Sequence, residues 1–397
     1  GGDGTLSKPF QTLSAVDAVD AVNDRIFVFT GTYTTSFVLL SGEQLIGQGA
    51  TGTTFDALFT ISPPTGTVAR PALSGTRPTI QNTVMLANSC VVRGLNIAAS
   101  NATALTDPAG ATTGVSVTEV DVSATTATAV SFNDLTGTVT LGSTNSTGST
   151  NTPISEDNNV SLTNVNATVN LGIGSLTGST GTAFDVSGGT GVITYGGTIT
   201  KANIAQRPVS IANKTGGSVT FTGGITANSG ATLPLGISLT NNSGSTVNFQ
   251  GGLALSTGAN PAFTATGGGT VNVTGAANTL ATTTGTALNV ANTTIGASGL
   301  TFQSISANGG TNGIVLNTTG TSGGLTVTGT GVTDGTGGTI QNVTTRGASF
   351  ISASNITLKN MNFTNAATVD GDADNSGLTT GDNLLSNAPI HLQGVTS

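Results

Sequence analysis

Four aspartates toward the C-terminal end of the sequence have the spacing of oxygen ligands for a cation. They are Asp370, Asp372, Asp374 and Asp382, with a glycine between the last two. Calcium-binding loops place carboxylate oxygens at alternate positions and need a glycine where the loop turns sharply. Counted from Asp372, however, the twelfth position is Asn383 instead of a bidentate Glu. The sequence therefore leaves two alternatives, a calcium site or a solvated acidic loop, and it suggests no cofactor other than calcium.

Cleavage of a polysaccharide needs acidic side chains that the middle of this chain lacks. Hydrolysis uses two carboxylates on either side of the scissile bond, and a lyase uses a base beside a substrate carboxylate. No Asp or Glu occurs between Asp185 and Asp334, and the single histidine, His391, falls in a strand-like run. The acid pair Glu119 and Asp121 is interpreted as solvated turn or face residues. We therefore expect no catalytic residues and no enzymatic activity.

Eight threonines and asparagines recur between pairs of apolar residues and are expected to point outward. They are Thr140, Asn170, Thr194, Thr220, Asn248, Asn272, Thr301 and Thr326. One interpretation is a ladder in which like polar side chains hydrogen-bond along successive strands. The alternative is a flat, ordered binding face for ice or for sugars.

The apolar residue before each polar one defines a repeat of roughly 26 residues, which is the signature of a solenoid. This first column runs through Val139, Val169, Ile193, Val219, Val247, Val271, Leu300 and Leu325. A second column runs through Phe184, Val209, Ile237, Phe263, Leu288, Ile314 and Ile340. Nearly all of these residues have an apolar companion two positions later, which places both members on one face of a strand. The columns predict an all-β fold, a right-handed single-stranded parallel β-helix with about three short strands per coil. Gly, Asn and Asp in the turns are expected to supply positive φ angles at its corners.

The first residues differ from the repeats. Phe10, Leu13, Val16 and Val19 have helical spacing within the stretch 8–23. We therefore predict an N-terminal cap with a short helix over residues 1–25 and one continuous solenoid domain over residues 26–397. The chain ends in the strand-like run 390–395, so a truncated C-terminus is expected.

The composition restricts the classes of partner. Charged residues make up 7% of the chain, and the few basic ones are scattered, so nucleic acid is an unexpected partner. No run of 18 apolar residues exists, so membrane insertion is not expected either. Cys90 stands in an apolar run and is predicted to be a small buried hydrophobe.

Three stretches carry a resemblance to a known family. The run 4–13 (GTLSKPFQTL) resembles the N-terminal cap of pectate-lyase-like β-helix proteins. The runs 92–97 (VRGLNI) and 356–363 (ITLKNMNF) resemble parallel β-helix repeats. The middle, rich in Gly and Thr, resembles the strand repeats of very large bacterial surface proteins. The resemblance implies a secreted or cell-surface location, and it leaves the activity open because the fold hosts many functions.

These observations favour a non-catalytic extracellular rod with a structural or adhesive role. The expected partners are flanking domains of the same longer chain, and surface glycans or like chains. A carbohydrate-binding or polysaccharide-degrading β-helix is the main alternative, with its site near residues 93–160 or 370–391. An ice-binding face is the third.

Overall fold

The computed structural model describes residues 2–148, 157–202, 205–228, 230, 232–364 and 389–397. The chain divides into two compact units. The first comprises Gly1–Thr180 and Gly189–Gly197, and the second comprises Gly181–Gly188 and Thr198–Ser397. Over the described residues, the fold is an all-β, single-stranded parallel β-helix with two short helices, which confirms the predicted fold class. The right-handed sense of the coil and the single continuous domain stay predictions.

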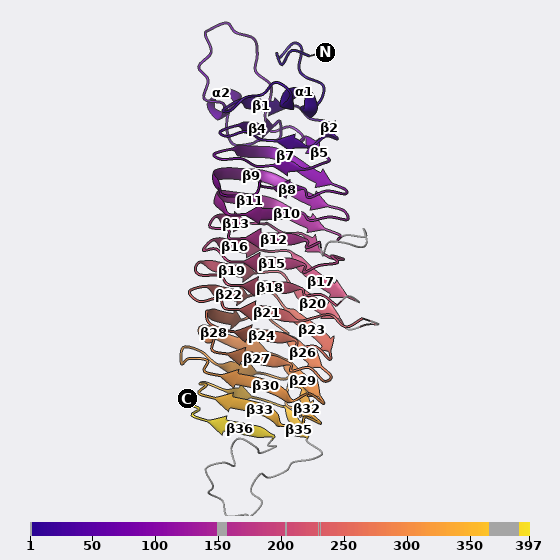
Figure 1. Cartoon of the computed structure of the whole chain (residues 1–397), viewed down its shortest axis with the longest axis vertical. Helices are drawn as coiled ribbons and strands as arrows, with labels where there is room; N and C mark the ends of the chain where they lie inside the picture. The colour runs from indigo at the N-terminus through magenta and orange to yellow at the C-terminus, as the bar shows by residue number, and fades with distance from the viewer. Residues whose placement is uncertain (1, 149–156, 203–204, 229, 231, 365–388) are drawn as a thin grey trace, which may run out of the picture. The chain divides into compact units, whose positions relative to one another are not determined.

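Strands of the second unit form three parallel ladders, and each strand pairs with the one three places later (Figure 1). The first ladder contains β15 (Phe184–Ser187), β18 (Val209–Ala212), β21 (Ile237–Thr240), β24 (Phe263–Thr266), β27 (Leu288–Ala291), β30 (Asn312–Asn317), β33 (Arg346–Ile351) and β36 (Ile390–Gln393). The second contains β17 (Thr198–Ala202), β20 (Ile225–Asn228), β23 (Leu253–Gly258), β26 (Thr279–Thr282), β29 (Ser304–Asn308), β32 (Thr339–Gln341) and β35 (Asn362–Thr364). The third contains β19 (Ser218–Phe221), β22 (Thr246–Phe249), β25 (Thr270–Val273), β28 (Thr294–Phe302), β31 (Leu325–Val327) and β34 (Thr357–Leu358).

The first unit is built from the same kind of parallel pairing. One ladder contains β1 (Arg25–Val28), β4 (Gln44–Gly47), β7 (Val91–Ala99), β9 (Thr112–Ala124), β11 (Leu135–Ser146), β13 (Thr168–Asn170) and β16 (Val192–Tyr195). Another contains β3 (Phe37–Val38), β6 (Val84–Met85), β8 (Leu105–Thr106), β10 (Val130–Asn133) and β12 (Val160–Thr163). The shorter strands β2 (Thr32–Tyr33), β5 (Thr79–Ile80) and β14 (Ser175–Leu176) pair onto the long strands or one another.

The interior of the second unit contains a row of phenylalanines. Phe221 and Phe249 occupy opposed positions on β19 and β22, with ring centroids 5.3 Å apart and nearly parallel planes. Phe249 also meets Phe263 edge-on at 5.5 Å, so the two ladders pack against each other through their rings. All three side chains are fully buried. This burial confirms the inward position that their period-two spacing predicts.

Asparagines form three of the corners that follow the first ladder of the second unit. Asn213, Asn241 and Asn292 directly follow β18, β21 and β27, and their φ angles are 56°, 56° and 50°. Asn tolerates this left-handed conformation better than most residues because its side chain can hydrogen-bond locally. The corners turn the chain so that the next residue points inward, and Lys214 and Asn242 are both buried.

The second apolar column was assigned wrongly at its last member. Ile340 lies on β32, where it is opposed to Ala307 and Phe363 in a different ladder. The column instead continues through Ala348, which pairs with Ile314 on β30. Turns of variable length separate the strands, so a constant step along the sequence does not identify equivalent positions.

The N-terminal cap contains the predicted helix, although the helix is short. Helix α1 covers Leu13–Asp17 and begins after Thr12, whose hydroxyl accepts a hydrogen bond from the Ala15 amide at 3.2 Å. Of the apolar residues in α1, only Leu13 is buried, and Val19 beyond it is exposed, so little packing energy is available to extend the helix. No helix in the described ranges is long and apolar enough to cross a membrane.

A second helix, α2 (Phe55–Leu58), was not predicted from the sequence. Its Phe55 packs against the outward side chain of Phe27 on β1, with ring centroids 5.1 Å apart. Phe59 joins this cluster and is buried. The outer face of the first coil is therefore apolar and covered, unlike the polar outer faces of later coils.

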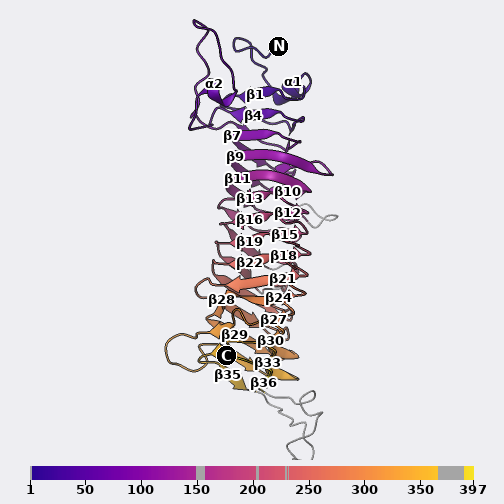
Figure 2. The same ribbon diagram turned by 90° about the vertical axis from the view of Figure 1, so that its left-hand side faces the viewer.

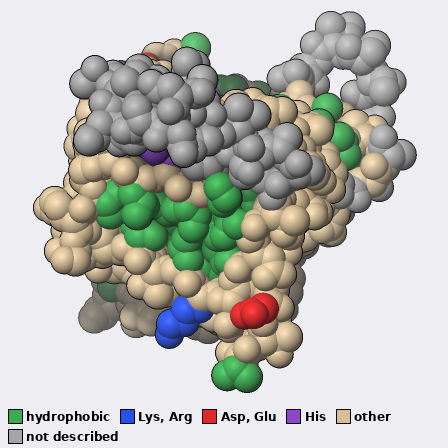
Figure 3. Space-filling model, turned by 90° about the horizontal axis from the view of Figure 1, so that it is seen from below, with side chains coloured by type: hydrophobic (Ala, Val, Ile, Leu, Met, Phe, Trp, Pro, Cys, Tyr) green, Lys and Arg blue, Asp and Glu red, His purple; other side chains and the backbone are tan. Residues whose placement is uncertain are grey.

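Hydrophobic side chains are exposed at the end of the second unit (Figure 3). Ile390 and Leu392 on β36 continue the register of the buried Ala348 and Phe350, but they are 41% and 63% exposed. Strand β36 pairs on its other side with no strand in the described part of the chain, so its apolar side chains lack the neighbour that covers earlier ones.

Candidate functional site

The predicted outward residues of the first unit lie side by side. Thr140 on β11 is opposed to Asn170 on β13, and Asn170 is opposed to Thr194 on β16. Thr140 and Asn170 are exposed and Thr194 is half-buried, whereas their apolar neighbours are buried. The alternation of inward and outward residues that the sequence predicts is therefore present in these strands.

In the second unit, the corresponding residues form a hydrogen-bonded ladder. The Asn272 side-chain amide donates to Asn248 Oδ1 at 2.9 Å, and the Asn248 amide donates to Thr220 Oγ1 at 3.3 Å. The three residues are directly opposed on β19, β22 and β25. An amide is both donor and acceptor, so asparagines stacked in register can pass hydrogen bonds along the strand direction.

The ladder does not continue to Thr301 as the sequence suggests. Val271 is opposed to Ile295 and Val273 to Leu300, so extra residues of β28 bulge out beside Asn272. A Cβ at Gly296 would lie 2.4 Å from Asn272 Oδ1, and this close approach leaves Asn272 only 8% exposed. Thr301 and Thr326 form a separate row, which continues to Thr357 on β34. The equivalence of Val271 with Leu300 was wrong because the bulge shifts the register.

The acid pair Glu119 and Asp121 belongs to an ionic cluster on the first unit and is not simply solvated. Arg93 Nε donates to Glu119 Oε2 at 2.6 Å, and Arg77 Nη1 donates to Asp121 Oδ2 at 2.6 Å. These residues come from β7, from β9 and from the segment before β5, and β7, β9 and β11 are neighbours in both ribbon views (Figures 1 and 2). Each of the two ion pairs thus places one guanidinium group beside one carboxylate at a partly exposed position.

Local backbone geometry positions the Glu119 side chain. Its φ is 55°, a left-handed conformation that costs a non-Gly residue energy. The carboxylate also accepts hydrogen bonds from the amide and hydroxyl of Thr51, which lies 68 residues earlier in the chain. Burial acts to raise the pKa of Glu119, but the hydrogen bonds from Arg93 and Thr51 outweigh it and hold the pKa at about 2. Glu119 is therefore a fixed anion at neutral pH.

Asp121 is held over a glycine that leaves room for it. Its Oδ1 accepts a hydrogen bond from the Ser143 hydroxyl at 3.1 Å, and a Cβ at Gly142 would lie 2.5 Å from the same oxygen. The other oxygen accepts from Arg77. This arrangement orients two cations and two anions at partly exposed positions, which suits the recognition of a polar, charged ligand.

Comparison of the chain with protein-family models, with curated proteins and with solved structures found no match in any of the three. The fold thus rests on the strand pairing described above.

The remaining predicted residues are placed as follows. Asp370, Asp372, Asp374 and Asp382 lie outside the described residues, so the calcium alternative stays a prediction. Within the described ranges, no group of three or more His, Cys, Asp and Glu residues could hold a metal ion.

His391 and Cys90 are both buried. His391 lies on β36, opposed to Ser349, and burial together with the charge of Arg346 lowers its pKa. Cys90 is fully buried, which confirms its predicted place in the core, and burial raises the pKa of its thiol to about 11. A thiol with this pKa stays protonated at neutral pH, so it is a poor nucleophile.

Proposed function

We propose that this chain is a non-enzymatic, structural or adhesive β-helix of an extracellular protein, and that its Thr- and Asn-lined face binds surface glycans or like chains. The observation that carries the proposal is the hydrogen-bonded ladder of Thr220, Asn248 and Asn272. It holds polar groups in a fixed row, with successive strands about 4.8 Å apart.

Preorganisation is the physical advantage of such a face. Hydroxyl and amide groups that are already ordered lose little conformational entropy when a sugar hydroxyl binds to them. Because these hydroxyl and amide groups are uncharged, binding of a neutral sugar does not require the desolvation of an ion. The resemblance to strand repeats of bacterial surface proteins supports an extracellular place for this activity.

The test is binding of the intact chain to an array of immobilised glycans. Thr220→Ala/Asn248→Ala removes two members of the row, and we expect glycan binding to fall at least about tenfold, the effect of losing roughly two hydrogen bonds. Ser238→Ala/Thr264→Ala is the matched control, because these half-buried residues oppose each other on the first ladder of the same unit. Equal binding by both variants would rule out the Thr- and Asn-lined face.

A second candidate function is favoured by the ionic cluster of Arg77, Arg93, Glu119 and Asp121. Arginine pairs with carboxylates bidentately, so an acidic polysaccharide could exchange places with Asp121 on Arg77. Incubation of the chain with pectin or alginate, followed by measurement of new reducing ends or unsaturated products, separates this function from the first. Turnover that is lost in Arg77→Ala but kept in Arg70→Ala, whose ion pair with Asp56 lies on α2, would replace the non-enzymatic proposal.

A further inference from the structure

A fully buried carboxyl group lies under the N-terminal cap. Glu43 immediately precedes β4 and is 0% exposed. Its Oε2 accepts a hydrogen bond from the Leu40 amide at 2.6 Å, whereas its Oε1 is buried without a hydrogen-bond donor in the described part of the chain. A buried carboxylate oxygen without a donor is costly, so this side of Glu43 requires either a proton or a partner.

The group beside it is another carboxyl. Asp20 follows helix α1, and its Oδ2 is likewise buried without a donor. The Asp20 amide donates to the Val16 carbonyl at 2.9 Å, so Asp20 continues the last turn of the helix. The side chains of Asp20 and Glu43 are hydrogen-bonded to each other. Two ionised carboxylates have no proton to donate, so this hydrogen bond needs one proton on the pair.

The electrostatic surroundings also favour the proton. Burial raises the pKa of Glu43 to about 7, and the charges of Asp20 and Asp24 act in the same direction. Burial and the charge of Asp17 raise the pKa of Asp20. Cys90, which precedes β7, is the other titratable group that interacts with Glu43, and it is neutral at this pH. The charged groups acting on Glu43 are thus all anions.

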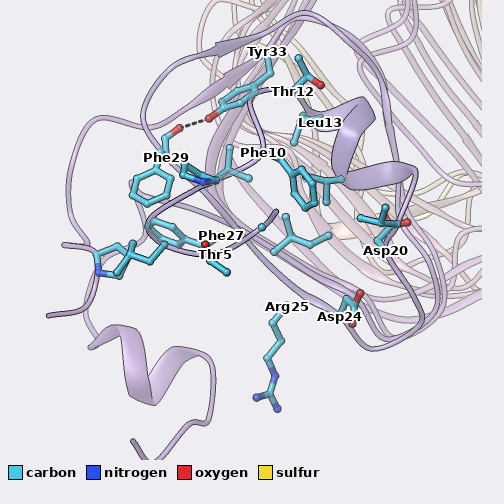
Figure 4. A pocket seen from close by; sticks show the side chains of 18 of the residues that line it. Thr5, Phe10, Thr12, Leu13, Asp20, Asp24, Arg25, Phe27, Phe29 and Tyr33 are labelled. Carbon is cyan, nitrogen blue, oxygen red and sulfur yellow. Dashed lines mark hydrogen bonds between the residues drawn. The ribbon is translucent and has the colours of Figure 1, made fainter. Parts of the chain in front are cut away.

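Helix α1 forms one wall of a cavity of about 590 Å³ over the first coil. Figure 4 shows Leu13 and Phe10 on one side of this cavity, Phe27 and Phe29 on the other, and Asp20 at its margin. Leu13 is the one buried side chain within α1, so few apolar contacts hold the helix in addition to the contact of Asp20 with Glu43.

We propose that a proton shared between Glu43 and Asp20 latches helix α1 over the first coil, and that loss of this proton releases the helix and opens the cavity that it borders. The device makes the cap responsive to pH near neutrality. Segment 23–24 stays attached in both states, since the Asn23 amide donates to the Ser41 carbonyl and the Gln44 amide to the Asp24 carbonyl. The hinge therefore lies between Asp20 and Asn23.

The direction of the pH effect follows from linkage. Glu43 binds its proton more tightly in the latched state, with a pKa of about 7, than in the released state, where its ordinary value is 4.5. The latch is therefore fully effective below pH 4.5 and is lost as the pH rises through 7. Between pH 5.5 and 8.0 the equilibrium constant for release should increase about 30-fold.

Hydrogen exchange of the intact chain measures this release directly. The amides of Ala18 and Asp20 are hydrogen-bonded within the helical turn, so their protection reports on α1. After correction for the intrinsic pH dependence of exchange, we expect protection to fall about 30-fold from pH 5.5 to 8.0. Glu43→Gln carries a neutral amide that can donate to Asp20, so its protection should be the same at both pH values within about twofold. Asp20→Asn provides a second variant with the same expected result.

Asp107→Asn is the matched control, because Asp107 is another buried carboxyl with a raised pKa in the same unit. The N-terminal cap of the Asp107→Asn variant should respond to pH as the cap of the natural chain does. Three results would each overturn the latch: protection that is independent of pH in the natural chain, a pH response that persists in both Glu43→Gln and Asp20→Asn, or a response that Asp107→Asn removes.

Discussion

Asn272 donates a hydrogen bond to Asn248, its directly opposed neighbour on β22. On its other side, Asn272 is covered by Gly296 of β28. Asn248 in turn donates to Thr220, so it occupies the centre of the row. Removal of the Asn248 side chain breaks both hydrogen bonds.

We predict that Asn248→Ala lowers the free energy of unfolding by about 1–3 kcal/mol, since it removes the acceptor of the buried Asn272 side-chain amide. Chemical denaturation followed by circular dichroism is the measurement. Thr264→Ala, an outward position on β24, is the control and should change stability by less than about 0.5 kcal/mol.

Phe249→Ala should cost about 3–5 kcal/mol, because it leaves a cavity between Phe221 and Phe263 that the stacked strands cannot close. Each strand interacts mostly with the strands directly beside it in its ladder, so a local defect need not unfold the whole unit. Melting of the variant is therefore expected to become multistate. Calorimetry measures both effects. A loss below about 1 kcal/mol would contradict the structural role assigned to this ring.

Lys214 should make stability depend on pH in the alkaline range. The side chain is buried at a corner after β18, and burial lowers its pKa from 10.5 to about 8. The unfolded chain therefore binds more protons between pH 8 and 10.5, and stability should rise with pH through this window. Lys214→Met removes this effect. The natural chain should therefore gain stability relative to the variant as the pH rises from 8 to 10.5, by about 3 kcal/mol at most. A difference that is constant between pH 7 and 10.5 would contradict this prediction.

Glu119→Gln tests the ion pair with Arg93. The pKa of Glu119 is about 2 in the fold against an ordinary value of 4.5, so its contribution is fully present above pH 4.5 and is lost as the pH falls through 2. We expect the variant to be about 1–2 kcal/mol less stable at pH 7, a value discounted for partial exposure, and equally stable near pH 2. Urea titrations at the two pH values provide the comparison, and a deficit that persists at pH 2 would assign the loss to packing alone.

The acidic segment with Asp370, Asp372, Asp374 and Asp382 gives a prediction from sequence only. If it binds calcium, titration calorimetry of the intact chain at millimolar calcium should show heat that disappears in Asp372→Ala/Asp374→Ala. No heat in the natural chain would favour the solvated acidic loop.

The sequence by itself determined the inward and outward faces of the strands and the character of the corners. Val219 and Phe221 are two residues apart, and a strand of any length must place them on one face. Asn213 stands where the backbone takes a positive φ, which few residues tolerate. These are local rules, so the fold class followed from them.

Only the tertiary structure decided which residues from different coils meet. Thr51 reaches Glu119 across 68 residues, and Asp20 meets Glu43 although three strands separate them in the chain. A repeat of constant length likewise does not predict the bulge beside Asn272 or the position of Ile340 on β32. The physical reason is that loops absorb insertions at low cost, so the vertical register between coils is set by strand pairing and packing rather than by the count of residues between strands.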